Sequence, residues 1–192
     1  MIRLLAVLAL ALAATPALAH PLVYHVLSFT AGFRHPLTGA DHILAMVAVG
    51  LWAALRGGRA RWAWPATFVT VMLVGGVLGM SGLVRFEPSA VESGIAASIV
   101  VLGLLVAAAA RLPTVAGAVL VGVFALFHGY AHGIEMPATG QAALYAAGFV
   151  LATAALHGVG LLLGTAARGR AEPALRALGA LTGAAGLAML LG

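Results

Sequence analysis

Long apolar runs recur along this chain, each separated from the next by a few polar residues, glycines or prolines. A helix needs about 20 apolar residues to cross roughly 30 Å of hydrocarbon, and runs of that length fill most of the sequence. Of the 192 residues, 63% are hydrophobic and only 8% are charged, which is too little polar surface to cover a soluble globule of this size. We therefore predict an all-α integral membrane protein with no separate soluble domain.

The first run, residues 1–19, differs from the others. It has one basic residue near its start, a short apolar core, a helix breaker at Pro16 and small residues ending at Ala19. This layout is typical of a cleavable secretory signal, so we predict a signal peptide at 1–19 and a mature membrane domain at 20–192 that begins with His20. An uncleaved first membrane helix is the alternative, although the apolar core is short for a span.

Six transmembrane helices are predicted after the signal peptide. We place them at 37–55, 63–84, 91–110, 113–131, 141–166 and 174–191.

The arginines predict the orientation of these spans. Every basic residue is an arginine, and arginines concentrate in the connections after the first, third and fifth spans. By the positive-inside rule these connections face the cytoplasm, so both ends of the mature chain face the periplasm across a bacterial inner membrane. The net charge of +5 therefore reflects topology and does not indicate a nucleic-acid partner.

Residues that are costly to place in lipid gather on the outer side of this topology. Six of the seven histidines and four of the five acidic residues fall near the outer ends of helices or in outer loops. Such groups are normally retained in a membrane only where they face the bundle interior or a wet cavity and have partners. The distribution indicates one shared polar site.

Two motifs carry most of these residues. In the stretch RHPLTGADHILAM, His35 precedes the neighbours Asp41 and His42, and Pro36 with Gly39 predicts a non-helical approach that folds His35 back over the helix end. In FHGYAHGIE, two histidines four residues apart are followed by a glutamate three residues later, which places all three on one face of a continuous helix.

Imidazoles with nearby carboxylates are ligands that suit borderline divalent metals such as Ni²⁺, Co²⁺ and Zn²⁺. The chain has no cysteine, so no thiolate is present to hold such a metal tightly. We predict a transported metal ion, no resident cofactor and no catalytic residue. The expected metal ligands are His35, Asp41, His42, His128, His132 and Glu135, with Glu92 and His20 as further candidates.

Each of these residues also has a purely structural interpretation. His128 and His132 can pack between helices with hydrogen bonds to backbone carbonyls. Asp41 and Glu92 can cap the helices that they open. His157, alone near the middle of the fifth span, is interpreted as a packed neutral histidine in preference to a second site along the path.

Glycines four residues apart recur within the spans, for example Gly75 and Gly79. They predict close approach of helix backbones. Gly129 and Gly133 alternate with the histidines of the second motif, so they predict either the same close packing or local unwinding that offers carbonyl oxygens to an ion. Three spans followed by three also suggest an inverted repeat with one motif on the first helix of each half.

The two motifs resemble those of the HupE/UreJ family of nickel permeases. The likeness extends over essentially the whole chain, including the signal peptide, the six spans and an acid at Glu92. The resemblance implies secondary transport of Ni²⁺, or Co²⁺, from periplasm to cytoplasm, supplying hydrogenase or urease maturation. The histidine-rich outer segment of some members is reduced here to His20 and His25.

Two other classes of membrane protein also use histidine ligands. A membrane electron-transfer protein would hold haem between histidines on either side of a wide apolar pocket, whereas these histidines are paired with acids at helix ends. A zinc-dependent membrane hydrolase is also compatible with two histidines and a glutamate, but no glutamate directly follows the first histidine of the second motif.

Overall fold

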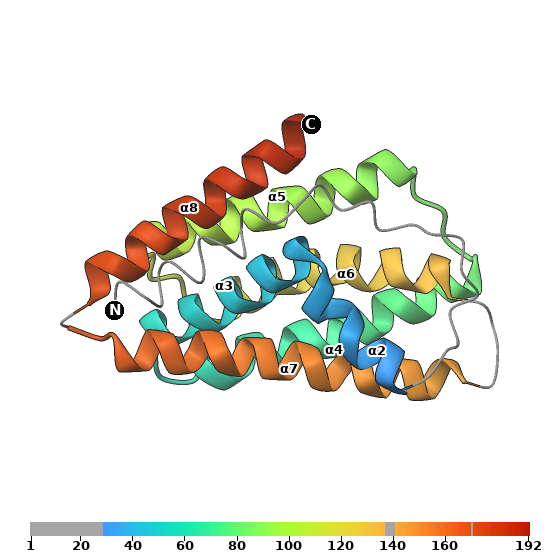
Figure 1. Ribbon diagram of the computed structural model, residues 1–192, viewed down its shortest axis with the longest axis horizontal. Coiled ribbons are helices and arrows are strands. Elements are labelled where there is room, and N and C mark those ends of the chain that lie inside the picture. Colours follow the sequence, from blue (N-terminus) through green and yellow to red (C-terminus); the bar gives the residue numbers. More distant parts are fainter. Residues whose placement is uncertain (1–28, 137–140, 170) are drawn as a thin grey trace.

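The computed structural model describes residues 29–136, 141–169 and 171–192, and within these ranges it contains helices and no strands (Figure 1). The predicted signal peptide at 1–19 and His20 lie outside the described residues. The seven described helices are α2 (Phe29–Thr38), α3 (Ala40–Arg56), α4 (Ala60–Ser81), α5 (Pro88–Ala107), α6 (Thr114–Glu135), α7 (Ala142–Ala166) and α8 (Glu172–Leu191).

Five of these helices, α4 to α8, are each long and apolar enough to cross a membrane, and the bent pair α2 and α3 meets the same test when taken together. The protein is therefore a multi-pass membrane protein. The helices coincide with the predicted spans to within a few residues. Of the six long helices, α6 extends furthest beyond its predicted end, from residue 131 to Glu135.

The segment before the first long helix is itself helical, so the predicted non-helical approach to this span was wrong. Pro36 lies inside α2, and the chain breaks only at Gly39, where α2 and α3 meet at 82°. Packing overrides the local signal because α2 lies directly on α7: a side chain at Gly32 would strike the backbone of Tyr145, and one at Gly148 would strike Phe29.

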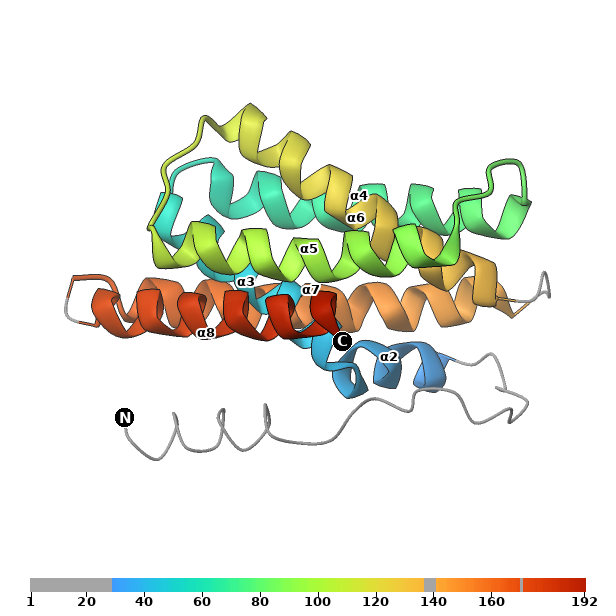
Figure 2. The same cartoon turned by 90° about the horizontal axis from the view of Figure 1, so that it is seen from above.

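The remaining helices pack chiefly in pairs: α4 with α6, α5 with α8 and α3 with α7. Figure 2 shows α4 and α6 crossing on one side of the bundle. Glycines line these crossings, as predicted. A Cβ at Gly75 would lie 2.5 Å from the carbonyl oxygen of Leu126, and one at Gly160 would strike the backbone of Val47. Contact of backbone against backbone is the usual way that helices associate in lipid, where hydrophobicity gives no drive.

Gly129 and Gly133 follow the same rule. Both lie in the continuous helix α6, and a side chain at either would strike the backbone of α4, at Met72 and Gly76 respectively. Of the two predicted roles, the structure shows close packing and no unwinding in this turn.

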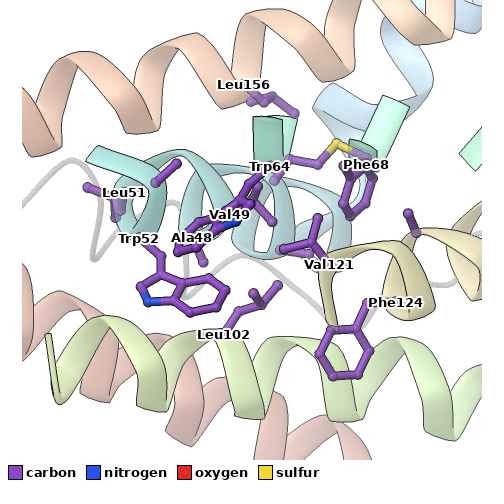
Figure 3. Packing of buried hydrophobic residues seen from close by; sticks show 14 of the residues in the cluster. Ala48, Val49, Leu51, Trp52, Trp64, Phe68, Leu102, Val121, Phe124 and Leu156 are labelled. Atoms are coloured by element: carbon purple, nitrogen blue, oxygen red, sulfur yellow. The ribbon is translucent and has the colours of Figure 1, made fainter. Parts of the chain in front are cut away.

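A buried tryptophan pair lies toward the end of the bundle where α3 finishes and α4 begins. Trp52 of α3 and Trp64 of α4 are both fully buried, with ring centroids 4.0 Å apart. Figure 3 shows Trp52 reaching toward Leu102 of α5. The indole nitrogens donate to the backbone oxygens of Ala110 and Thr114, each at 2.8 Å, so both polar tips are satisfied. These bonds fix the α5–α6 connection against α3 and α4.

Arginines hold the same end of the bundle together. Arg168 donates to the carbonyl of Ala54 at 2.5 Å, and Arg176 donates to that of Ala107 at 2.7 Å. Cations at helix C-termini satisfy free carbonyls and complement the helix dipole. We call this the arginine end, where α3, α5 and α7 finish, and the opposite end the histidine end, where α3 and α7 begin and α6 finishes.

Candidate metal centre

Three imidazoles from separate helices meet at the histidine end. His42 lies in the first turn of α3, and His132 lies in the last turn of α6. The bend at Gly39 brings α2 across this end, so the ring centroid of His35 is 4.6 Å from that of His132 and 5.6 Å from that of His42. The fold therefore joins the two sequence motifs at one point.

The spacing of these rings suits a single metal ion. One nitrogen from each of His35, His42 and His132 can be chosen so that all three lie within 4.8 Å of one another. The Nε2 atoms of His42 and His132 are 2.5 Å apart. Nitrogens bound to one ion at about 2.0–2.1 Å lie on the order of 3–4 Å from each other, so small ring movements would accommodate one.

Each of two imidazoles has a carboxylate beside its other nitrogen. Asp41 Oδ1 lies 2.9 Å from His42 Nδ1, and Glu135 Oε2 lies 3.8 Å from His132 Nδ1. A carboxylate at Nδ1 favours the proton there and leaves the Nε2 lone pair for a metal, an arrangement common around metal-binding histidines. Asp41 therefore lies where it can orient the imidazole of His42, whereas Glu135 is beyond hydrogen-bond distance of His132. The Nε2 atoms of the two imidazoles converge on the other side.

The polar groups are graded from the surface inward. The side chains of Glu135 and Asp41 are 50% and 34% exposed, whereas those of His132 and His42 are 11% and 5% exposed. A cation approaching this end would meet negative charge first and imidazole nitrogens next. The order suits capture of a hydrated ion followed by partial loss of its water.

His128 lies one helical turn deeper and is fully buried. Its Nδ1 donates to the carbonyl oxygen of Phe124 at 3.0 Å, while its Nε2 has no hydrogen-bond partner. Its ring centroid is 5.6 Å from that of His42. The packing interpretation explains only one nitrogen of this side chain, and the other is left with a free lone pair close to the imidazole cluster.

Helix α7 contributes walls that sequence reasoning did not find. The ring of Phe149 lies against all three clustered imidazoles, at 4.6 Å from His132 and 5.9 Å from both His35 and His42. Tyr145, one turn earlier, contacts His35 at 6.2 Å. Aromatic residues in an apolar run carry no distinguishing signal. The only hint was the four-residue spacing that places both on the face that also carries His157.

A cavity of about 220 Å³ opens beside the cluster between α4, α6 and α7. Its wall is almost entirely apolar and includes His132, Phe149 and three methionines, Met72, Met80 and Met136. The cavity therefore reaches the cluster from the side of the bundle.

One predicted ligand lies away from the cluster, and one predicted helix cap is not formed. Glu92 is exposed in the second turn of α5, and it is not part of the imidazole cluster. The cap of α3 is Gly39, with no side-chain cap bond, so Asp41 does not cap this helix and its carboxylate is directed to His42.

Comparison with known proteins identifies the family. The family described as HupE / UreJ protein matches residues 8–189. The chain is 46% identical over 185 residues to Protein HupE of Rhizobium leguminosarum bv. viciae, a match that covers 95% of each chain. No solved structure matches the chain. With a family match over nearly its whole length and this degree of identity, the chain belongs to the HupE/UreJ family.

Proposed function

We propose that this protein is a permease that carries Ni²⁺, or Co²⁺, across the membrane, and that it is not an enzyme. The observation that carries the proposal is the meeting of His42 and His132 Nε2 atoms beside His35, with a carboxylate behind two of the rings. Neutral imidazoles favour borderline metals over Mg²⁺ and Ca²⁺, which prefer oxygen ligands.

The expected mechanism begins at the two carboxylates that lie nearest the surface. Asp41 and Glu135 attract the hydrated cation, and His35, His42 and His132 replace part of its water. A site made of imidazoles without thiolates binds a divalent metal loosely enough to release it, which transport requires. Inward movement of a cation is favoured by about 2.3 kcal/mol per charge for each 100 mV, inside negative, so uptake needs no counter-ion.

The direction of transport follows from the proposed orientation. The arginine end would face the cytoplasm and the histidine end the periplasm of a bacterial inner membrane, with six spans and both ends of the mature chain outside. Metal would then move inward and supply hydrogenase or urease metallocentre assembly. Family membership supports this role.

The geometry argues against the two rival functions. A haem held between His42 and His132 would need space for an iron and its macrocycle, yet their Nε2 atoms are 2.5 Å apart. A hydrolase needs a general base facing the bound water. Glu135 lies behind His132, on the Nδ1 side of the ring and away from the converging nitrogens.

Uptake of nickel-63 into cells tests the proposal. We expect the His42→Ala variant to lose uptake, by about tenfold or more at nickel concentrations below saturation, because one of three converging nitrogens and its orienting contact are removed. Ser81→Ala, at the same end of the bundle but outside the cluster, is the matched control and should transport normally. Protein levels in the membrane are compared by immunoblot.

Two results would count against a nickel permease. The first is wild-type protein that raises nickel uptake no more than an empty vector. The second is a His42→Ala variant that transports at the wild-type rate when present at the same level.

A further inference from the structure

His157 of α7 is buried in the middle of the bundle without the partners that a structural histidine normally has. Its side chain is 2% exposed, and neither ring nitrogen has a hydrogen-bond partner. An imidazole kept for packing usually donates its N–H to a carbonyl, as His128 does to Phe124. Unsatisfied ionisable groups inside a membrane are costly and are usually retained for function.

A line of buried side chains on α7 leads from the imidazole cluster to this residue. Tyr145, Phe149, Thr153 and His157 are spaced four residues apart, and all are buried. The first two contact the cluster. At 1.5 Å per residue, His157 lies about 12 Å along the helix beyond Phe149, well inside the apolar helix α7.

Helices α4 and α6 complete the surroundings of His157. The ring of Phe68 lies 5.1 Å from that of His157 and 5.5 Å from that of His128, so one aromatic side chain touches both imidazoles. Thr153 Oγ1 lies 3.9 Å from the sulfur of Met72, which is one turn from Phe68 on α4. Two imidazoles, a hydroxyl and a thioether are thus gathered in one buried region.

We propose that His128 and His157 form a second binding station for the transported cation, with Met72 and Thr153 beside it. The proposal rests on the proposed function. The Nδ1–H of His128 is committed to Phe124, which leaves its Nε2 lone pair available, and both nitrogens of His157 are free. Imidazole and thioether ligands suit borderline and soft metals.

The station would differ from the imidazole cluster in charge. Asp41 and Glu135 remain at the histidine end, and the four side chains of the station carry no formal negative charge when the histidines are neutral. It would therefore hold a divalent cation more weakly than the cluster does. Its role would be to bind the ion briefly as it crosses the membrane, after the cluster has captured it. A weaker second site lets an ion advance and leave.

The test compares His157→Leu with His157→Met. These substitutes have similar volumes, but only methionine can coordinate a metal. We expect His157→Leu to lower the maximal rate of nickel-63 uptake by about tenfold or more with little change in the concentration for half-maximal uptake, because capture at the cluster is intact. His157→Met should recover a substantial part of that rate.

The purely structural role makes the opposite prediction. If His157 only fills space, leucine should be tolerated or stabilising, since it removes two unsatisfied nitrogens. Unchanged uptake by His157→Leu, or equal losses in the Leu and Met variants, would overturn the proposal. If His157→Leu does not accumulate in the membrane, Met72→Leu is measured in its place, because it removes the thioether at similar volume. A reduced maximal rate of uptake then supports the station, and an unchanged rate overturns it.

Wild type and His42→Ala are measured in parallel. Absence of nickel uptake or binding by wild-type protein would defeat the proposed function itself. A different result would defeat only the second station: wild type takes up nickel, His42→Ala does not, and His157→Leu takes it up at the wild-type rate.

Discussion

At the scale of single residues, the two carboxylates of the site are not equivalent. Asp41 lies 2.9 Å from the imidazole of His42 and is the less exposed acid, whereas Glu135 lies 3.8 Å from that of His132 and is half exposed. A closer and less solvated carboxylate holds the ring orientation more firmly and interacts more strongly with a nearby cation. Asp41 should therefore matter more to metal affinity than Glu135.

Amide substitutions test this difference. We expect Asp41→Asn to weaken nickel binding by about 10- to 100-fold, as loss of an orienting partner typically does, and Glu135→Gln to weaken it by less. Isothermal titration of nickel into the purified, detergent-solubilised variants measures both affinities. Glu172→Gln, at the arginine end, is the matched control and should bind as wild type does. An affinity ranking with Glu135→Gln as the weaker binder would contradict the geometry.

The sequence was sufficient to predict the polar residues that meet at the histidine end. Charged and imidazole side chains are rare in an apolar chain, so their positions at helix ends are informative. It was not sufficient to separate the converging imidazoles from the acids behind them, because that depends on ring orientation. It also did not reveal Phe149 and Phe68, since an aromatic residue that faces a site and one that faces lipid look alike in a single sequence.

At the scale of helices, the glycines determine which surfaces meet. Gly160 and Gly158 lie on the same helix, α7, but have different surroundings. A Cβ at Gly160 would strike the backbone of α3 at Val47, whereas a Cβ at Gly158 would have no atom within 4 Å. Backbone cannot move aside as a flexible side chain does, so only the first position is sensitive to a methyl group.

This contrast predicts opposite effects on stability. We expect Gly160→Ala to destabilise the protein by about 1–3 kcal/mol through overpacking of α3 against α7. Gly158→Ala should be neutral or slightly stabilising, because alanine has the higher helix propensity. Thermal unfolding of both variants in the same detergent, followed by tryptophan fluorescence, measures the difference. Equal melting temperatures would show that α3 and α7 are not packed through Gly160.

The helix boundaries were predictable because an apolar run of fixed length is a strong signal. The bend between α2 and α3 was not. Pro36 and Gly39 pointed to irregular chain, but the packing of α2 on α7 through Gly32 and Gly148 supports a helix there. Contacts between segments more than a hundred residues apart decide this local structure, and single-sequence patterns do not report them.

At the scale of the whole molecule, the three main helix pairs have the pattern that an inverted repeat requires, although weaker contacts such as α3 with α5 have no counterpart between α6 and α8. With α2 and α3 counted together as one span, the first three spans correspond in order to α6, α7 and α8. Exchanging each span with its counterpart turns the α3–α7 pair into the α6–α4 pair. The same exchange leaves the α5–α8 pair unchanged. His42 and His132 belong to corresponding spans, α3 and α6. The imidazole cluster therefore lies where the two halves meet.

Metal binding should consequently stabilise the whole fold. Nickel at about 100 times its dissociation constant is expected to add about 2.7 kcal/mol to the free energy of unfolding, because it binds the folded arrangement and not the separated helices. The melting temperature of wild-type protein should rise with nickel and not with magnesium. His42→Ala should show a much smaller rise. An equal rise in that variant would indicate that nickel binds elsewhere.

The tight backbone contacts also determine how the bundle is able to move. Because backbone meets backbone at Gly160 between α3 and α7, and at Gly129 between α4 and α6, each pair is expected to shift as one rigid body. The boundary between these bodies passes through the imidazoles of His42 and His132 at one end and the contacting rings of Trp52 and Trp64 at the other. A cation bound between His42 and His132 would hold the two bodies together at the histidine end. Binding and release of the cation would therefore control when the bodies can rotate about the contact between Trp52 and Trp64.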